Sequence, residues 1–198
     1  MHGIERRFCT SSLTFRDRAD NDLPGIIGHL EGYIALFDSD SYDLGGFVER
    51  IKRGTFKNSL AKNDVVCLFN HEHSQCLGRM SAGTLELVED DKGLRLVDLK
   101  IPDTQAGRDL VVNSHFKNIK GCSFGFAIIS NDVESRDGVI LSTLTDVDLH
   151  EVSVGVTFPA YPEASAELRS LVKFQRTVKT ARLRAASRLK LLRTKSAR

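Results

Sequence analysis

The stretch that decides the fold is residues 121–129, which read GCSFGFAII. Its side chains alternate between two sets, and the first set is Cys122, Phe124, Phe126 and Ile128. A period of two is typical of a β-strand with one buried face. We therefore predict a strand that places this set in the core. Ser123 then lies on the other face, where its near neighbours Gly125 and Ala127 are small.

Similar patterns on both sides of this stretch predict a mainly β body. The expected strands are residues 26–37 with a bend at Gly32, 65–69, 84–88, 94–101, 121–129 and 139–158. The third and fourth of these form a hairpin across the turn EDDKG. The pattern indicates an α+β class in which strands dominate.

Helices are expected at two places within this body. Residues 47–60 predict two short helical turns broken at Gly54. A helix capped by Asp103 or Thr104 is expected to run to about Phe116.

The chain divides into three segments. Residues 1–25 are poorly patterned, and we expect the first eleven to be frayed. Residues 26–162 form the predicted domain. Over residues 163–198, apolar side chains recur at three- and four-residue spacings among Lys and Arg, which predicts a basic amphipathic helical tail.

Composition excludes several protein classes. The 198 residues are 41% hydrophobic and 27% charged, as in ordinary globular chains and unlike collagen or disulfide-dense scaffolds. No run has the ~20 apolar residues of a membrane helix, and the first residues lack the apolar core of a signal peptide. The four cysteines form no CxxC pair, so we expect reduced thiols.

The small net charge of +2 hides an uneven distribution. Residues 173–198 hold ten of the 28 basic side chains and none of the 26 acidic ones. The preceding residues therefore hold 18 basic and 26 acidic groups, a net charge of −8. A basic tail is typical of proteins that bind polyanions or acidic protein surfaces. A nucleic-acid-binding protein is accordingly one alternative, although the body is acidic and has no Trp.

Three kinds of chemically capable side chain lie in or beside the predicted strands. His71 follows the strand 65–69, Ser123 lies in 121–129, and the carboxylates Asp148 and Glu151 lie on opposite faces of a regular strand. A serine nucleophile needs a base, usually His, and a third group that orients the base. Each residue taken alone is also compatible with a structural role, because a triad is defined by geometry rather than by spacing.

Other chemistry is less favoured by the sequence. Cys122 is a rival nucleophile, but its apolar face indicates a buried and inert thiol. His71 and His73 could both face one side of a strand, yet no further ligands with matching spacing follow. We therefore expect no metal and no cofactor.

Six motifs, taken in order from about residue 27 to 162, resemble those of the caudovirus prohead proteases, which process the inside of an immature phage capsid. The residues that carry the resemblance are Gly32-Tyr33 with Phe37, then Glu49, Ile51, Gly54 and Phe56, then Asn70-His71 with Leu77-Gly78-Arg79, then Thr84-Leu85-Glu86-Leu87 with Gly93-Leu94, then Gly121 and Ser123-Phe124-Gly125-Phe126, and finally Leu149, Glu151-Val152-Ser153 and Phe158-Pro159-Ala160.

The resemblance implies a fold and a set of roles. The fold is a β-barrel flanked by helices, similar to the herpesvirus assemblin protease. Ser123 is implied as the nucleophile and His71 as the general base. The third member is Glu151 in the EVS motif, with Asp148 as the alternative when the chain is matched to the herpesvirus enzymes. Residues 155–156 lack the paired arginines of those enzymes, so backbone N–H groups are expected to stabilise the oxyanion.

The resemblance also implies a serine endopeptidase of capsid maturation. Its substrates are the major capsid protein with its scaffold segment, and the chain itself, whose basic tail is a candidate for removal or docking. The implied location is the procapsid inside the bacterial cytoplasm, with no membrane and no nucleic-acid partner. A homo-oligomer is compatible with it. The alternative is a catalytically inert capsid-assembly or scaffold protein with a protease-like fold.

Overall fold

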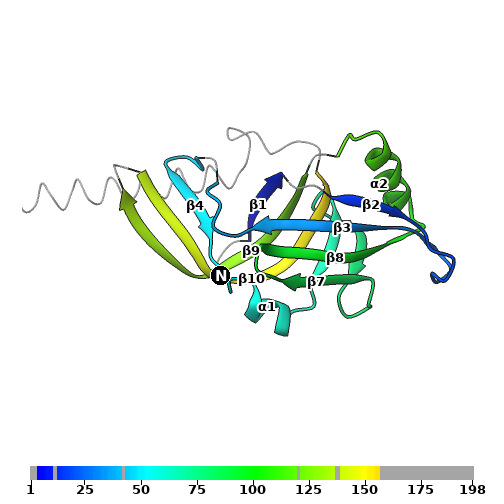
Figure 1. Ribbon diagram of the computed structural model, residues 1–198, viewed down its shortest axis with the longest axis horizontal. Helices are drawn as coiled ribbons and strands as arrows, with labels where there is room; N and C mark the ends of the chain where they lie inside the picture. Colours follow the sequence, from blue (N-terminus) through cyan, green and yellow to red (C-terminus); the bar gives the residue numbers. More distant parts are fainter. Residues whose placement is uncertain (1–3, 11–12, 42, 120, 137–138, 157–198) are drawn as a thin grey trace, which may run out of the picture. The chain divides into compact units, whose positions relative to one another are not determined.

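The computed structural model describes residues 4–10, 13–41, 43–119, 121–136 and 139–156 (Figure 1). Within these residues the strands are β1 (Glu5–Thr10), β2 (Thr14–Asp17), β3 (Ile26–Leu36), β4 (Phe47–Ile51), β5 (Val66–Phe69), β6 (Glu72–Arg79), β7 (Leu85–Glu89), β8 (Gly93–Pro102), β9 (Gly121–Arg136) and β10 (Val139–Val156). The helices are α1 (Lys57–Lys62) and α2 (Gln105–His115). Strands dominate, as the sequence predicts. The tail helix expected over 163–198 lies outside the described residues.

The strands form two open sheets. The first has the order β1-β9-β10-β5-β6, with β4 as a further partner of β10, and the second has the order β2-β3-β8-β7. A barrel would need a ladder that joins the sheets, and none does so in the part of the chain described. The expectation of a closed barrel is therefore wrong for this part. The two sheets instead contribute to one hydrophobic core.

Strand β10 is the longest element and organises the first sheet. Its first half pairs in parallel with β4, its second half pairs in parallel with β5, and β9 runs antiparallel along it. The ladder with β9 has several register shifts, one of them between Leu149 and Glu151. Such shifts mark β-bulges, which change the direction in which the following side chains point.

Aromatic side chains fill the centre of the core. Phe56, just before α1, meets Phe124 of β9 edge to face with ring centroids 5.4 Å apart, and it stacks on Phe37. Phe124 in turn stacks on Phe126. These two β9 side chains and Cys122 are fully buried, which confirms three of the four predicted core residues, and the fourth, Ile128, is partly buried against the same core.

Several other predicted elements are confirmed. The hairpin of β7 and β8 is present, and α2 begins where Thr104 Oγ1 accepts a hydrogen bond from the Gly107 N–H. Strand β3 has a register shift at Gly32, whose φ is +147°. Cys67 is a buried free cysteine and Cys76 an exposed one. Neither described helix is long and apolar enough to cross a membrane.

Two local predictions are wrong. Residues 47–51 form β4 rather than a helical turn. The buried members of this strand include Glu49, which binds Arg7, so a charge occupies a position where the period of two predicts an apolar residue. Residues 5–10 form β1 rather than a frayed end, because they pair with β9, which is distant in sequence.

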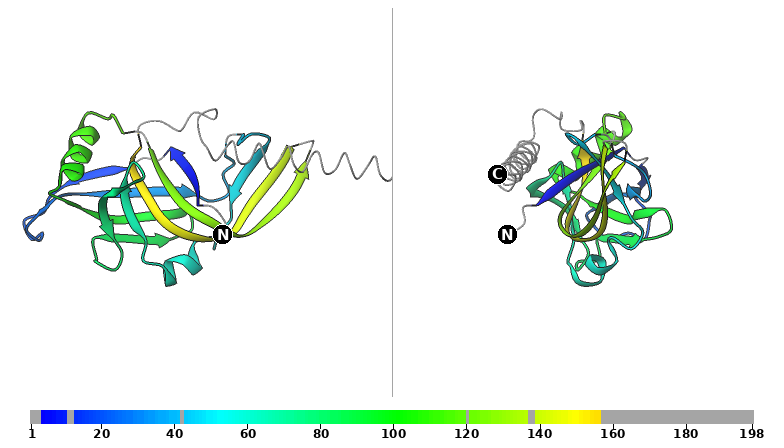
Figure 2. Two further views of the ribbon diagram at one scale, coloured as in Figure 1. Left: turned by 180° about the vertical axis from the view of Figure 1, so that it is seen from behind. Right: turned by 90° about the vertical axis from the view of Figure 1, so that its left-hand side faces the viewer.

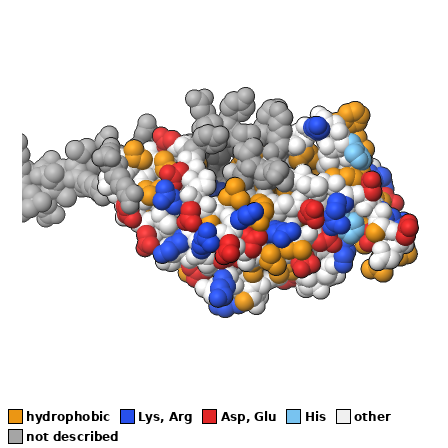
Figure 3. Space-filling view, in the orientation of Figure 1, with side chains coloured by type: hydrophobic (Ala, Val, Ile, Leu, Met, Phe, Trp, Pro, Cys, Tyr) orange, Lys and Arg blue, Asp and Glu red, His pale blue; other side chains and the backbone are white. Residues whose placement is uncertain are grey.

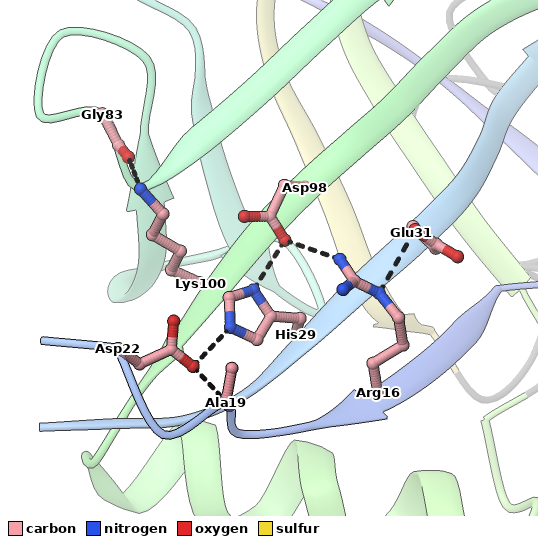
Figure 4. Close-up of polar contacts among 8 residues, drawn as sticks. All are labelled: Arg16, Ala19, Asp22, His29, Glu31, Gly83, Asp98 and Lys100. Carbon is pink, nitrogen blue, oxygen red and sulfur yellow. Dashed lines mark hydrogen bonds and ion pairs between the residues drawn. The ribbon is translucent and has the colours of Figure 1, made fainter.

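A buried histidine ties the turn before β3 to the second sheet (Figure 4). His29 Nδ1 lies 2.8 Å from Asp98 Oδ1, and Nε2 lies 2.8 Å from Asp22 Oδ2. Burial by itself lowers the pKa of His29, but the two carboxylates outweigh it and raise that pKa above its ordinary value. The hydrogen bond from His29, helped by the Ala19 N–H, lowers the pKa of Asp22. The cluster therefore favours the doubly protonated imidazolium, in which both ring nitrogens donate.

The core arrangement predicts a large cost for Phe56→Ala. Phe56 is fully buried between two aromatic rings, so the substitution is expected to lower the free energy of unfolding by about 3–5 kcal/mol. Urea unfolding measures this. The matched control is Phe116→Ala, because Phe116 is 74% exposed and should change stability by less than about 0.5 kcal/mol. Equal effects of the two substitutions would contradict the packing described.

The His29 cluster predicts a pH-dependent loss of stability in His29→Gln. Because the folded pKa of His29 is raised, its stabilisation is complete below its unfolded pKa of about 6.5 and is lost as the pH rises through the folded pKa. The difference in unfolding free energy between parent and variant should therefore be larger near pH ~6 than near pH ~9. Urea unfolding at both pH values checks this, with His73→Gln at an exposed position as the control. A difference that grows with pH would show that the imidazolium is not favoured.

Candidate active site

His71 lies in the two-residue turn that joins β5 to β6. Phe69 and Glu72 are the strand residues that pair on either side of the turn. The two central residues, Asn70 and His71, have φ values of +49° and +63°. Positive φ at both positions is the signature of a type I′ hairpin turn, which favours Asn followed by Gly. A histidine in this conformation costs about 1–2 kcal/mol, so other contacts must hold it.

Two hydrogen bonds fix this turn to β10. The Asn70 N–H donates to the carbonyl of Val154 at 2.9 Å, and the His71 N–H donates to Ser153 Oγ at 3.1 Å. Strand β5 pairs with β10 as far as Phe69, so the turn follows directly on the last residue of that ladder. The backbone of His71 is therefore set by the first sheet.

The His71 ring contacts the carboxylate of Glu151. Nδ1 lies 2.7 Å from Glu151 Oε1, and the other oxygen, Oε2, accepts a hydrogen bond of 2.6 Å from Ser153 Oγ. Arg6 Nε of β1 lies 3.8 Å from the same Oε1. Glu151 is only 4% exposed, and an ion of this kind is stable in a protein interior only when it is paired and hydrogen-bonded. Both carboxylate oxygens therefore have partners, Oε1 in His71 and Arg6 and Oε2 in Ser153.

The bulge in β10 gives Glu151 its direction. Leu149 pairs with Phe126 on the core face, whereas Glu151 pairs with Gly125 on the opposite face. In a regular strand Glu151 shares the face of Leu149, as the sequence predicts. The extra residue, His150, overturns that expectation by shifting the register by one. The carboxylate consequently leaves the apolar face and joins the face that carries Ser123.

Ser123 lies on the same face of the sheet as this pair. It is opposite Ser153 of β10, and paired residues of neighbouring strands point to the same side. It is almost fully buried at 2% exposure. No hydrogen bond joins Ser123 Oγ to His71 in the described residues. The structure thus brings His71 and Glu151 into contact and places Ser123 on the adjoining strand.

Gly125 makes room for the carboxylate. A Cβ at this position would lie 2.6 Å from Glu151 Oε1, closer than real Cβ contacts come. Glycine at position 125 therefore leaves the space over the face of β9 that the side chain of Glu151 occupies.

The other sequence candidates lie elsewhere. Asp148 accepts a hydrogen bond from Asn63 Nδ2 at 2.7 Å and lies 3.5 Å from His150 Nε2, and none of its contacts involves His71. Cys122 Sγ is buried against the carbonyl of Ile34 in the core. No group of three or more His, Cys, Asp or Glu side chains is arranged to hold a metal ion among the described residues.

Sequence reasoning missed two neighbours of the site. The sequence puts Ser153 on the strand face of Glu151 by the spacing Glu151-x-Ser153, but it assigns Ser153 no role in holding the carboxylate. Arg6 belongs to the segment that we expected to be frayed, and its contact arises from the long-range pairing of β1 with β9. Only the first of these had a local signal in the sequence.

Comparison with known proteins gives a consistent result. Residues 15–179 match the model of the caudovirus prohead serine protease family. A curated relative, the prohead protease of Enterobacteria phage HK97, is 30% identical over 141 residues. The match covers 69% of this chain and 58% of the relative, so the chain spans little more than half of that protein's length. No solved structure matches the chain. Because the family model covers most of its length, the chain belongs to the caudovirus prohead serine protease family.

Proposed function

We propose that this chain is a serine endopeptidase with Ser123 as the nucleophile, His71 as the general base and Glu151 as the group that orients the base. The observation that supports this best is the 2.7 Å contact of His71 Nδ1 with a buried carboxylate. A histidine held in this way keeps its proton on Nδ1 and leaves Nε2 as the basic nitrogen. Asp148 is the weaker candidate for the third role, because its partners are Asn63 and His150.

The proposed reaction is acyl transfer. Nε2 of His71 takes the proton of Ser123 Oγ as that oxygen attacks the scissile carbonyl, and Glu151 stabilises the imidazolium that results. The imidazolium then gives the proton to the leaving amine, and the acyl chain stays on Ser123. Water, activated by the same histidine, releases the acyl chain and regenerates the serine.

The proposed oxyanion donors are backbone N–H groups at the end of β10. The register with β9 shifts between Ser153 and Val156, next to the residue that pairs with Ser123. Gly155 within this interval has a φ of +77°. Backbone N–H groups in such irregular segments are free to point toward a developing negative charge.

The biological role proposed here follows the family. The substrates are scaffold and capsid-protein segments inside the procapsid in the bacterial cytoplasm, and the chain itself, with residues 163–198 as the segment removed or docked. A relation to the herpesvirus assemblin protease is part of this proposal only as an implication of the family resemblance. On the face seen in Figure 3, Lys and Arg side chains are interspersed with Asp and Glu, which does not favour a nucleic-acid surface there.

The proposed role of Ser123 predicts the loss of cleavage in Ser123→Ala. Co-expressed with its capsid and scaffold proteins, the parent should shorten them and itself, and Ser123→Ala should be at least about a thousandfold slower. Intact mass spectrometry measures the products. Ser130→Ala, an exposed serine of the same strand, is the matched control and should cleave normally. If the parent also leaves every chain intact, the inert assembly protein becomes the better description.

The contacts of Ser153 predict that it positions the proposed base. Ser153→Ala removes the donor to Glu151 Oε2 and the acceptor of the His71 N–H. A lost hydrogen bond to a charged group is worth about 1.5–3 kcal/mol, so kcat should fall by about 10- to 150-fold while KM changes little. Ser153→Thr keeps the hydroxyl and should restore most of the rate.

The control for this prediction is Ser142→Ala. Ser142 is also a buried serine of β10, but it accepts its hydrogen bond from Asn131 in the other half of the strand. Its substitution should leave kcat unchanged. A fall in kcat for both variants would show that Ser153 acts only through stability.

A further inference from the structure

The edge of β9 that carries Ser123 is covered by the chain's own N-terminal strand (Figures 1 and 2). Strand β1 runs antiparallel to β9, with Phe8 directly opposite Ser123 and Arg6 opposite Gly125. Because opposite residues point to the same side of a sheet, Arg6 and Phe8 share the face of the proposed catalytic side chains. The contact of Arg6 with Glu151 agrees with this placement.

An uncovered sheet edge can bind an extended peptide. The unpaired N–H and C=O groups of the edge hydrogen-bond the peptide as a further strand, and alternate side chains of that strand fall on one face of the sheet. On its other side β9 is already paired with β10. A peptide chain that reaches Ser123 by strand pairing must therefore take the position that β1 holds.

The two faces of β1 are held very differently. On the core face, Arg7 makes two hydrogen bonds to the buried carboxylate of Glu49, at 2.6 and 2.8 Å, lies over the Phe126 ring and also binds Glu5. On the site face, the ion pair of Arg6 is 3.8 Å long, and its side chain is 39% exposed. Arg7 therefore anchors β1 strongly on the core side. On the side that faces the proposed catalytic residues, Arg6 makes only the long ion pair with Glu151.

We propose that the β9 edge from Gly121 to Phe126 binds substrate as an extended antiparallel strand, and that β1 occupies this edge as an internal inhibitor. The proposal rests on the peptidase function proposed above. Phe8 then takes the place of a substrate residue beside Ser123. Arg6 brings a positive charge to the same carboxylate oxygen that orients His71, where it opposes formation of the imidazolium.

The first test removes the strand. A chain lacking residues 1–10 is compared with the full chain. The truncated chain alone carries Glu49→Gln, so that the loss of Arg7 leaves no unpaired buried carboxylate, while the full chain keeps the Arg7–Glu49 pair that anchors β1. Substrate competes with β1 only in the full chain, so the KM for a capsid-derived peptide should fall about tenfold on truncation. An unchanged or higher KM overturns the proposal.

The second test measures binding without catalysis. Ser123→Ala is added to both chains, and the probe is a fluorescent peptide with the sequence of residues 4–10, in which Ser replaces Cys9. By fluorescence anisotropy, the truncated chain should bind this probe at least about tenfold more tightly than the full chain. Equal binding to the two chains overturns the internal-inhibitor proposal.

The two tests separate this proposal from the proposed function. If the probe binds the truncated chain but no chain hydrolyses any peptide, the strand site stands and the peptidase function fails. If both chains hydrolyse peptide with the same KM and neither binds the probe, the peptidase stands and the strand site fails.

A second variant covers the case in which the truncated chain does not fold. Arg6→Ala with Phe8→Ala, in the full chain, removes the side chains of β1 that face the site and keeps the Arg7 anchor. Its KM should also fall, by about threefold or more, because the weakened strand leaves the edge more often. Arg16→Ala in β2, the edge strand of the other sheet, is the matched control and should have the parent KM. A KM equal to that of the parent overturns the proposal here too.

Discussion

The buried carboxylate of Glu151 is the constraint on which the arrangement of the site depends. Taking a carboxylate out of water costs several kcal/mol unless it is paired and hydrogen-bonded, and here both oxygens are used, one by the His71 ring and one by Ser153. The surrounding chain conforms to that requirement. A bulge in β10 turns the Glu151 side chain to the face that carries Ser123, and Gly125 leaves space for the carboxylate there. The turn that holds His71 is hydrogen-bonded to the same strand, β10. Ser123, Glu151 and Ser153 therefore stand on paired strands, and His71 stands on a tight turn that is hydrogen-bonded to them, which limits how far these groups can drift.

Much of the sheet architecture was predictable because one face of many strands is buried. The alternation in 121–129, the hairpin of β7 and β8, and the cap of α2 are local signals, and each was found where the sequence placed it. Strands β1 and β4 were missed for a common reason. Each contributes one member of the buried Arg7–Glu49 ion pair, so a charged residue stands on the core side of the strand. A pattern of apolar residues cannot reveal a strand whose inward charge is neutralised by a residue 42 positions away.

The candidate site was predictable in its residues but not in its geometry. Family motifs singled out His71, Ser123 and the two carboxylates, and strand periodicity put Glu151 on an apolar face. A bulge adds one residue without any strong sequence signal, so a period-of-two argument fails from that residue onward. The EVS motif alone favours Glu151 over Asp148, and the contacts of Glu151 with His71 and of Asp148 with Asn63 add a reason that the sequence does not contain.

The positive φ of His71 sets backbone stability against the proposed role of this residue as general base. Glycine is the residue that a type I′ turn favours after Asn, and it would relieve the backbone strain of about 1–2 kcal/mol there. A thermostability screen, or a design program that scores backbone fit alone, would accordingly enrich glycine at 71 and discard the imidazole. Variants of this chain that are selected for thermostability should therefore be grouped by the residue at position 71 before their melting temperatures are compared.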